Sequence, residues 1–202
     1  MPVMLEAVTN IDLALLHAIR DTCTTPVLDA VVPFVTSLGN LAFVWFVAAA
    51  LLIRSKRYRP YGIAVVIAIA VAFLIGEVGI KNIVERPRPF LADPSLATEF
   101  IRLPSSFSFP SGHTGSSFAA AAALCFLPLK RGWIKAVPLC GAALVAFSRL
   151  YLCVHYPSDV LGGIVIGVAC GIAAGLFAER FLVPHSGRVC GPPKRMRDDA
   201  SR

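Results

Sequence analysis

Three short segments of this 202-residue chain carry the residue types that bind phosphate and act on it. Residues 81–89 hold a lysine and arginines, residues 109–113 read Phe-Pro-Ser-Gly-His, and residues 148–159 contain Ser-Arg, a histidine and an aspartate. Lysine and arginine suit a phosphate dianion because their charge-assisted hydrogen bonds to its oxygens are strong. The two histidines can attack phosphorus or move protons. Together the three segments indicate phosphoryl chemistry.

The candidate phosphate-binding residues share either a fixed positive charge or a position at the start of a helix. They are Lys81, Arg88, Ser111, Gly112 and Arg149. Residues 110–113 directly precede an apolar run, so their backbone N–H groups should lie at a helix N-terminus, where anions bind. Gly112 would let the backbone approach an anion closely. Ser111 is also a candidate N-cap, a role that is compatible with phosphate contact.

The candidate catalytic residues are His155, His113 and Asp159. Pro157 is well placed to begin a helix, which puts Asp159 in the first turn, where a carboxylate is favoured. A carboxylate near one imidazole nitrogen fixes the tautomer and leaves the other nitrogen free as a nucleophile. We therefore expect one histidine to attack phosphorus. The other should give a proton to the leaving oxygen and later take one from water.

A metal site is the chemical alternative, because imidazole and carboxylate are standard metal ligands. The nearby Lys81, Arg88 and Arg149 oppose it, since they would set fixed positive charges beside a divalent cation. The six cysteines have no metal-type spacing either. We therefore expect neither a metal ion nor another cofactor.

The composition is that of a membrane protein. Hydrophobic residues make up 56% of the chain and charged residues 15%, and the mean hydropathy is +0.72; soluble domains are about 45–50% apolar. We predict an all-α, polytopic transmembrane helix bundle with five or six spans. The clearer spans are 61–80, about 116–129, 133 to about 152, and 160–178. The stretch 30–53 is either one span or a short helix followed by a span, because a turn signal interrupts it.

Glycines recur at every fourth position of the last apolar run. They are Gly163, Gly167, Gly171 and Gly175. Small residues at this spacing line one face of a helix and let a neighbouring helix approach closely. The run is therefore predicted to be a packing helix.

The net charge of +7 does not indicate a nucleic-acid partner, because much of the positive charge flanks apolar runs. Basic segments at 54–59, at 130–135 and in the tail are predicted to be cytoplasmic. Residues 81–112 and 149–159 then share the opposite face of the cell membrane. The site is therefore expected to face the periplasm or the exterior.

The three segments strongly resemble the signature of the type 2 phosphatidic acid phosphatase (PAP2) superfamily, which also includes vanadium haloperoxidases. That signature is a lysine, six residues and Arg-Pro; then Pro-Ser-Gly-His; then Ser-Arg, five residues, histidine, three residues and aspartate. Residues 81–89, 110–113 and 148–159 match it without departure. The resemblance implies a PAP2/haloperoxidase-like core within the membrane bundle.

The resemblance also implies a role for each matched residue. His155 would be the nucleophile that forms a phosphohistidine, Asp159 would orient it, and His113 would act as general acid and then as base. The remaining matched residues, Lys81, Arg88, Ser111, Gly112 and Arg149, would bind the phosphoryl oxygens. Arg86 lies outside the signature and is a candidate contact for a second phosphate or a lipid head group.

Among small bacterial members the chain resembles undecaprenyl-diphosphate phosphatases. Phosphatidylglycerophosphate or phosphatidate is the alternative substrate, and a lipid phosphotransferase is the alternative activity. A lipid-binding protein without catalysis is opposed by the complete histidine and aspartate set. The expected partners are a lipid phosphate substrate and membrane lipids, with the oligomeric state left open.

The chain is predicted to have three parts. Residues 1–24 form an interfacial helix, because apolar and charged residues alternate there with a weak helical period. Residues 25–183 form the PAP2-like transmembrane domain. Residues 184–202 form a basic cytoplasmic tail that is expected to contact anionic head groups or to have no fixed structure.

Overall fold

A computed structural model of the chain is all α-helical, as predicted, and describes residues 2–129 and 131–183. The α-helices are α1 (Pro2–Cys23), α2 (Pro26–Leu38), α3 (Phe43–Arg54), α4 (Arg59–Phe73), α5 (Lys81–Val84), α6 (Pro89–Ala92), α7 (Gly112–Leu124), α8 (Ala136–Tyr151) and α9 (Pro157–Phe177). Short 3-10 turns are η1 (Asn40–Ala42), η3 (Pro94–Leu96) and η4 (Gly132–Lys135), and π-helical segments are η2 (Leu74–Ile80) and η5 (Ala178–Leu182). The predicted tail, 184–202, lies outside the described residues.

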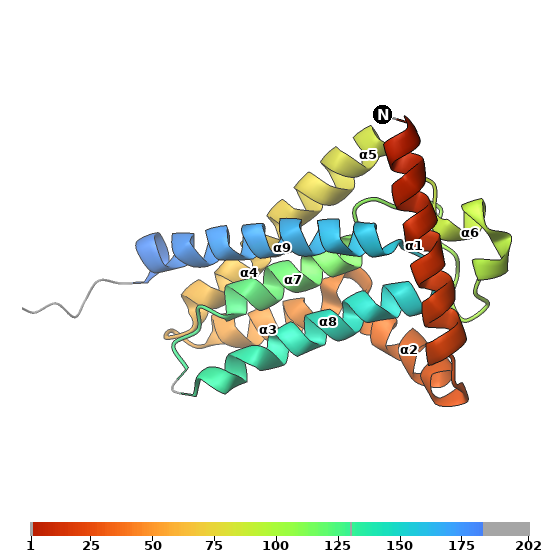
Figure 1. The fold of residues 1–202 in the computed structure, drawn as a ribbon. Helices are drawn as coiled ribbons and strands as arrows, with labels where there is room; N and C mark the ends of the chain where they lie inside the picture. Colours follow the sequence, from red (N-terminus) through yellow and green to blue (C-terminus); the bar gives the residue numbers. More distant parts are fainter. Residues whose placement is uncertain (1, 130, 184–202) are drawn as a thin grey trace, which may run out of the picture.

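Helices α3, α4, α7, α8 and α9 form an elongated bundle, and α1 runs across one end of it (Figure 1). Helix α7 is central, because it packs against α9, α4 and α8. Its middle is a run of small side chains, Ala119–Ala123, that is buried throughout. Small residues let the surrounding helices approach α7 closely.

The four-glycine face of α9 packs against α7 and the turn that follows it. A Cβ atom added at Gly163 would lie 2.7 Å from the carbonyl oxygen of Ser111, and one added at Gly167 would lie 2.4 Å from that of Gly115. Gly171 and Gly175 are equally close to Ala119 and Phe126. The prediction of a packing helix is confirmed, and its partner is α7.

Length and composition identify three or four membrane spans among the described residues. Three stretches qualify alone: Arg59–Ala92, Gly132–Tyr151 and Pro157–Leu182. Helices α2 and α3 meet at a bend of 48° and qualify together as a fourth. The predicted turn therefore does break the stretch 30–53. Helix α7 has 13 residues and ends at Leu124 rather than near 129, which is shorter than the ~20 residues that cross hydrocarbon.

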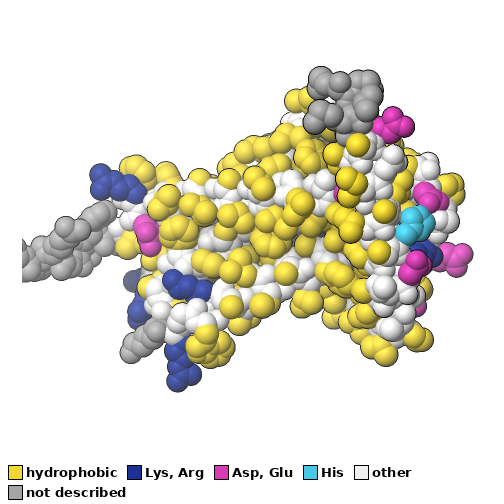
Figure 2. Space-filling view, in the orientation of Figure 1, with side chains coloured by type: hydrophobic (Ala, Val, Ile, Leu, Met, Phe, Trp, Pro, Cys, Tyr) yellow, Lys and Arg dark blue, Asp and Glu magenta, His cyan; other side chains and the backbone are white. Residues whose placement is uncertain are grey.

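Hydrophobic side chains cover the long sides of the bundle (Figure 2). Several large apolar side chains are highly exposed, including Phe43, Leu51, Leu161, Val165 and Phe181. Most of the visible lysine and arginine side chains gather at the end away from α1, whereas the acidic side chains visible near α1 lie at the opposite end (Figure 2). An apolar belt between polar ends is the surface of a multi-pass membrane protein.

Candidate active site

One cavity of about 670 Å³ brings together seven of the eight predicted site residues. It is lined by Lys81, Arg88, Ser111, Gly112, His113, Arg149 and His155. The eighth, Asp159, lies directly behind His155. The lining of the same cavity also has an apolar part, which includes Phe46, Ile69, Phe73 and Leu74. The cavity therefore joins a cationic pocket to a hydrophobic wall.

His155 lies in the short connection between α8 and α9 and is only 2% exposed. Its Nδ1 is 3.5 Å from Oδ2 of Asp159, and its Nε2 is 3.4 Å from a guanidinium nitrogen of Arg88. Burial lowers the pKa of His155 from the ordinary 6.5 to about 3; Asp159 opposes this shift, and Arg88 and Arg149 add to it. The imidazole is therefore neutral, with a lone pair available for attack.

Asp159 is completely buried in the first turn of α9, and α9 begins at Pro157 as predicted. Its Oδ2 accepts hydrogen bonds from the backbone N–H of Tyr156, at 2.9 Å, and from the Ser108 hydroxyl. The same oxygen faces His155. The carboxylate is thus held at the base of the imidazole by contacts that fix its orientation.

Three buried cations surround the space in front of His155. Lys81 Nζ pairs with Glu77 at 2.5 Å. The Arg88 guanidinium donates to the carbonyl oxygens of Ser106 at 2.6 Å and Val154 at 2.7 Å, so loop backbone anchors it.

Arg149 donates to the Thr36 hydroxyl from α2, but its buried Nε has no partner among the described residues. A buried guanidinium with an open donor calls for an anion.

The start of α7 lies at the wall of the cavity, with Ser111 as its N-cap residue. The predicted N-cap position is confirmed, but the Ser111 hydroxyl bonds to the Thr114 hydroxyl at 2.9 Å and caps no backbone N–H. The first N–H groups of α7 are thus not capped by Ser111. A Cβ atom at Gly112 would lie 2.1 Å from Oε1 of Glu77. The position of the Glu77 carboxylate therefore also requires glycine at residue 112.

His113, the second histidine, contacts a residue that sequence reasoning missed. Its Nε2 lies 2.9 Å from the side-chain oxygen of Asn40, in the turn between α2 and α3. Gly39 makes this approach possible, because a Cβ there would lie 3.0 Å from His113 Cδ2. The only signal in the sequence was a turn, which gave no reason to connect Asn40 with a histidine 73 positions later.

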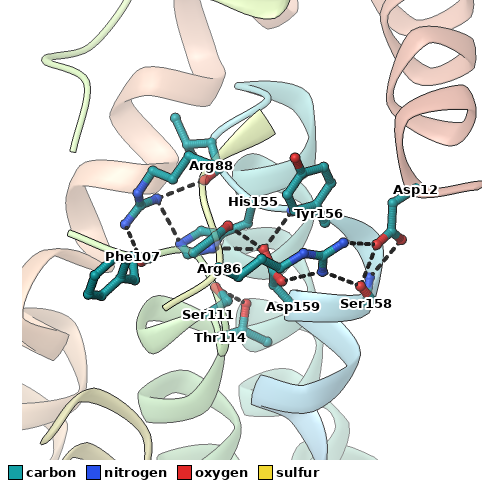
Figure 3. A network of polar contacts seen from close by, with 12 residues as sticks. Asp12, Arg86, Arg88, Phe107, Ser111, Thr114, His155, Tyr156, Ser158 and Asp159 are labelled. Atoms are coloured by element: carbon teal, nitrogen blue, oxygen red, sulfur yellow. Dashed lines mark hydrogen bonds and ion pairs between the residues drawn. The ribbon is translucent and has the colours of Figure 1, made fainter. Parts of the chain in front are cut away.

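Arg86 does not take the position that we expected. It is absent from the cavity lining and is only 6% exposed. Figure 3 shows it between the carboxylates of Asp159 and Asp12, to each of which it donates a hydrogen bond of 2.8 Å. The structure gives no support to the expected contact with a second phosphate or a head group: Nη1 and Nη2 are paired with carboxylates, and the buried Nε, which has no partner among the described residues, does not line the cavity.

Comparison with known proteins agrees with this geometry. The profile described as the PAP2 superfamily matches residues 61–181, which is more than half of the chain. This chain belongs to the PAP2 superfamily. It is therefore a PAP2-type membrane phosphatase, and the family is one of metal-independent hydrolases.

Three similar proteins represent the matches. An undecaprenyl-diphosphatase from Sulfolobus acidocaldarius is 33% identical over 69% of this chain and 66% of its own length. The undecaprenyl-diphosphatase BcrC from Bacillus subtilis is 29% identical over 76% of each chain. The crystal structure of a transmembrane PAP2-type phosphatidylglycerolphosphate phosphatase from Bacillus subtilis superposes with a TM-score of 0.71, at 28% identity, over 87% of this chain and 88% of that one. The PAP2 transmembrane fold is therefore shared.

Proposed function

We propose that this phosphatase hydrolyses undecaprenyl diphosphate to undecaprenyl phosphate through a phosphohistidine on His155. The observation that carries the proposal is the cavity itself, in which three buried cations, Lys81, Arg88 and Arg149, face a neutral imidazole. Such a pocket attracts a phosphoryl group and presents a nucleophile to it.

In the first step, a ring nitrogen of His155 forms a bond to the terminal phosphorus, and the bond from phosphorus to the bridging oxygen breaks. Nε2 is the better placed nitrogen, because Nδ1 faces Asp159 and Nε2 lies beside Arg88. His113 donates a proton to the leaving oxygen. Lys81, Arg88 and Arg149 stabilise the charge on the transferring group, and the N-terminus of α7 adds its N–H groups.

In the second step, His113 takes a proton from water, and the resulting hydroxide attacks the phosphorus of phosphohistidine. The P–N bond breaks, inorganic phosphate leaves, and His155 is neutral again. Asn40 lies within hydrogen-bonding distance of His113 Nε2 and would fix its ring through both steps.

The apolar wall beside the cations supports a lipid as the substrate. Phe46, Ile69 and Phe73 would contact the chain next to the phosphate, while the cations hold the head. The two undecaprenyl-diphosphatases named above favour a polyprenyl diphosphate. The structural similarity to a phosphatidylglycerolphosphate phosphatase keeps phosphatidylglycerophosphate, and with it phosphatidate, as the second candidate.

We also infer five spans and an outward-facing site. Helix α7 would be the fifth span: it is enclosed by α4, α8 and α9, so it needs neither the length nor the hydropathy of a lipid-facing helix. With the basic segment 54–59 on the cytoplasmic side, the opposite ends of α4, α8 and α9 face the periplasm or the exterior. That end carries His155.

The direct test compares undecaprenyl diphosphate, phosphatidylglycerophosphate and phosphatidate with the purified protein in one detergent, with and without a chelator. We expect fastest phosphate release from undecaprenyl diphosphate, no effect of the chelator, and a ³²P-labelled phosphohistidine in the wild type. His155→Ala should lose both signals. His17→Ala is the matched control, because His17 is far more exposed and pairs with Asp93 outside the cavity. Full activity in His155→Ala would refute the mechanism.

A phosphotransferase would pass the phosphoryl group from His155 to a lipid hydroxyl rather than to water. Terminally labelled lipid diphosphate supplied together with a second lipid alcohol separates the two reactions. We expect the label as free phosphate; label on the second lipid would establish transfer instead.

A further inference from the structure

A continuous chain of polar contacts leads from His155 to helix α1, which crosses the end of the bundle (Figures 1 and 3). It runs from His155 through Asp159 and Arg86 to Asp12. All four side chains are at most 6% exposed. The sequence signature contains the first two members and neither of the last two.

Arg86 uses its two terminal nitrogens for different carboxylates. Nη1 donates to Oδ1 of Asp159, at 2.8 Å, and Nη2 donates to Oδ2 of Asp12, also at 2.8 Å. The guanidinium carbon lies 3.9 Å from the ring centre of Tyr156, a cation–π contact. Arg86 is thus held from three sides.

Asp12 is held just as firmly at the other end. Its Oδ1 accepts from the backbone N–H of Ser158 at 3.1 Å, and its Oδ2 accepts from the Ser158 hydroxyl. Leu16, one turn further along α1, is completely buried in a cluster with Tyr156, Cys153 and Leu96. Helix α1 is therefore docked on the turn that carries His155 by one buried carboxylate and one buried leucine.

The contacts on Asp159 divide between its two oxygens. Arg86 occupies Oδ1, whereas Oδ2 is the oxygen that faces His155 Nδ1 and that the Tyr156 N–H and the Ser108 hydroxyl stabilise. Without Arg86, Oδ1 would lose its charged partner in a buried site, and a buried charge that loses its partner drives rearrangement. The Tyr156 N–H and the Ser108 hydroxyl would still hold Oδ2, but Oδ1 would no longer be fixed, so the carboxylate would be less firmly constrained to face the imidazole.

We propose that Arg86 is a positioning residue for the nucleophile and that α1, through Asp12, is part of the catalytic apparatus. Arg86 supplies the counter-charge of Asp159 and sets its rotation, and Asp12 keeps Arg86 extended toward Asp159. This proposal rests on the role of His155 proposed above. It makes the N-terminal helix necessary for the chemical step, beyond any role in membrane attachment.

The test uses the purified full-length protein with Arg86→Gln, Arg86→Lys, Asp12→Asn and the double variant Asp12→Asn/Arg86→Gln. Two matched controls remove the same charges from exposed positions: Arg102→Gln in the loop before α7, and Asp21→Asn on α1. Each protein is assayed for kcat, KM, inhibition by inorganic phosphate, and the rate of ³²P-phosphohistidine formation in a single turnover. Thermal melts report the folded fraction.

We expect Arg86→Gln to lower kcat and the rate of phosphohistidine formation by about 10- to 100-fold, by analogy with the loss of an outer contact that orients a metal-binding side chain. KM and phosphate inhibition should stay within about twofold, because the cavity cations are untouched. Arg86→Lys should recover part of the rate, since it keeps the charge. Asp12→Asn should lose less than Arg86→Gln, and the double variant should lose no more than Arg86→Gln alone, because Asp12 acts through Arg86. Both controls should match the wild type.

Two results would overturn the proposal. In the first, folded Arg86→Gln and Asp12→Asn keep the wild-type rate of phosphohistidine formation. In the second, KM and phosphate inhibition weaken in parallel with kcat, which would mean that Arg86 serves the phosphate pocket or general stability. Failure of the proposed function is separate, because the wild type itself would then form no phosphohistidine.

Discussion

His155 is a base in surroundings that disfavour its protonated form. Its folded-state pKa of about 3 is below the ordinary 6.5, mainly because the ring is buried, and Arg88 and Arg149 repel a proton as well. The unfolded chain therefore takes up a proton below pH 6.5 that the folded chain does not. The contribution of His155 to stability is complete above pH 6.5 and is lost as the pH falls from 6.5 toward 3.

The corresponding prediction concerns how the melting temperature depends on pH when the protein is in detergent without substrate. One such proton makes unfolding easier by at most about 1.4 kcal/mol per pH unit. When the pH is lowered from 6.5 to 5, the melting temperature of the wild type should fall further than that of His155→Gln. Equal slopes in the wild type and His155→Gln would contradict the neutral, buried imidazole.

At the scale of the element, the close pairing of α7 and α9 sets the site. Helix α7 carries Ser111, Gly112 and His113 at its N-terminus, and α9 carries Asp159 in its first turn. The backbone N–H of Ser111 donates to the carbonyl oxygen of Asp159 at 3.1 Å, so the two helix starts are joined directly. Such an approach requires glycine along the contact.

The prediction at this scale is that Gly167→Ala destabilises the protein. Its new Cβ would lie 2.4 Å from the Gly115 carbonyl oxygen, and that oxygen belongs to backbone that cannot move without shifting α7. Overpacking of this kind costs about 1–3 kcal/mol. Gly132→Ala is the matched control, because nothing lies within 4 Å of a Cβ there. Thermal or denaturant melts of both variants measure the difference, and equal melts would exclude a tight α7–α9 contact.

At the scale of the whole molecule, the cavity is at the end of the bundle opposite the 54–59 segment. We infer the direction in which it faces from charge, because arginine and lysine in short loops favour the cytoplasmic side. The basic residues of 54–59 do not line the cavity, so the orientation can be tested independently of activity.

The orientation can be tested by labelling single cysteines that are introduced into a chain whose native cysteines have been replaced. Ser105→Cys lies in the exposed loop before α7, and Lys56→Cys lies in the exposed turn between α3 and α4. A membrane-impermeant thiol reagent added to intact cells should label Ser105→Cys and leave Lys56→Cys unlabelled until the cells are lysed. The reverse pattern would place the site on the cytoplasmic side.

Sequence patterns alone were enough to predict the family, the helical membrane fold, the packing glycines and eight site residues, seven of which the fold brings around one cavity. This was possible because spacing along a helix and hydropathy are local properties that a linear pattern records. Hydropathy left the number of spans open, because a turn signal interrupts the apolar stretch 30–53. The span expected at about 116–129 corresponds to α7, which has only 13 residues, most of them small and buried against other helices.

The distant residues that support the signature could be identified only from the folded chain. Three contacts join segments whose separation along the chain follows no regular pattern. They are Glu77 beside Gly112, Asn40 on His113, and Asp12 on Arg86. Asp12 and Arg86, for example, are 74 positions apart. Arg86 in particular lies two residues before the signature arginine, and from the sequence it was a candidate contact for a second phosphate or a lipid head group. The folded chain turns it to the other side of His155, where α1 supplies a buried carboxylate, because a buried guanidinium needs a charged partner.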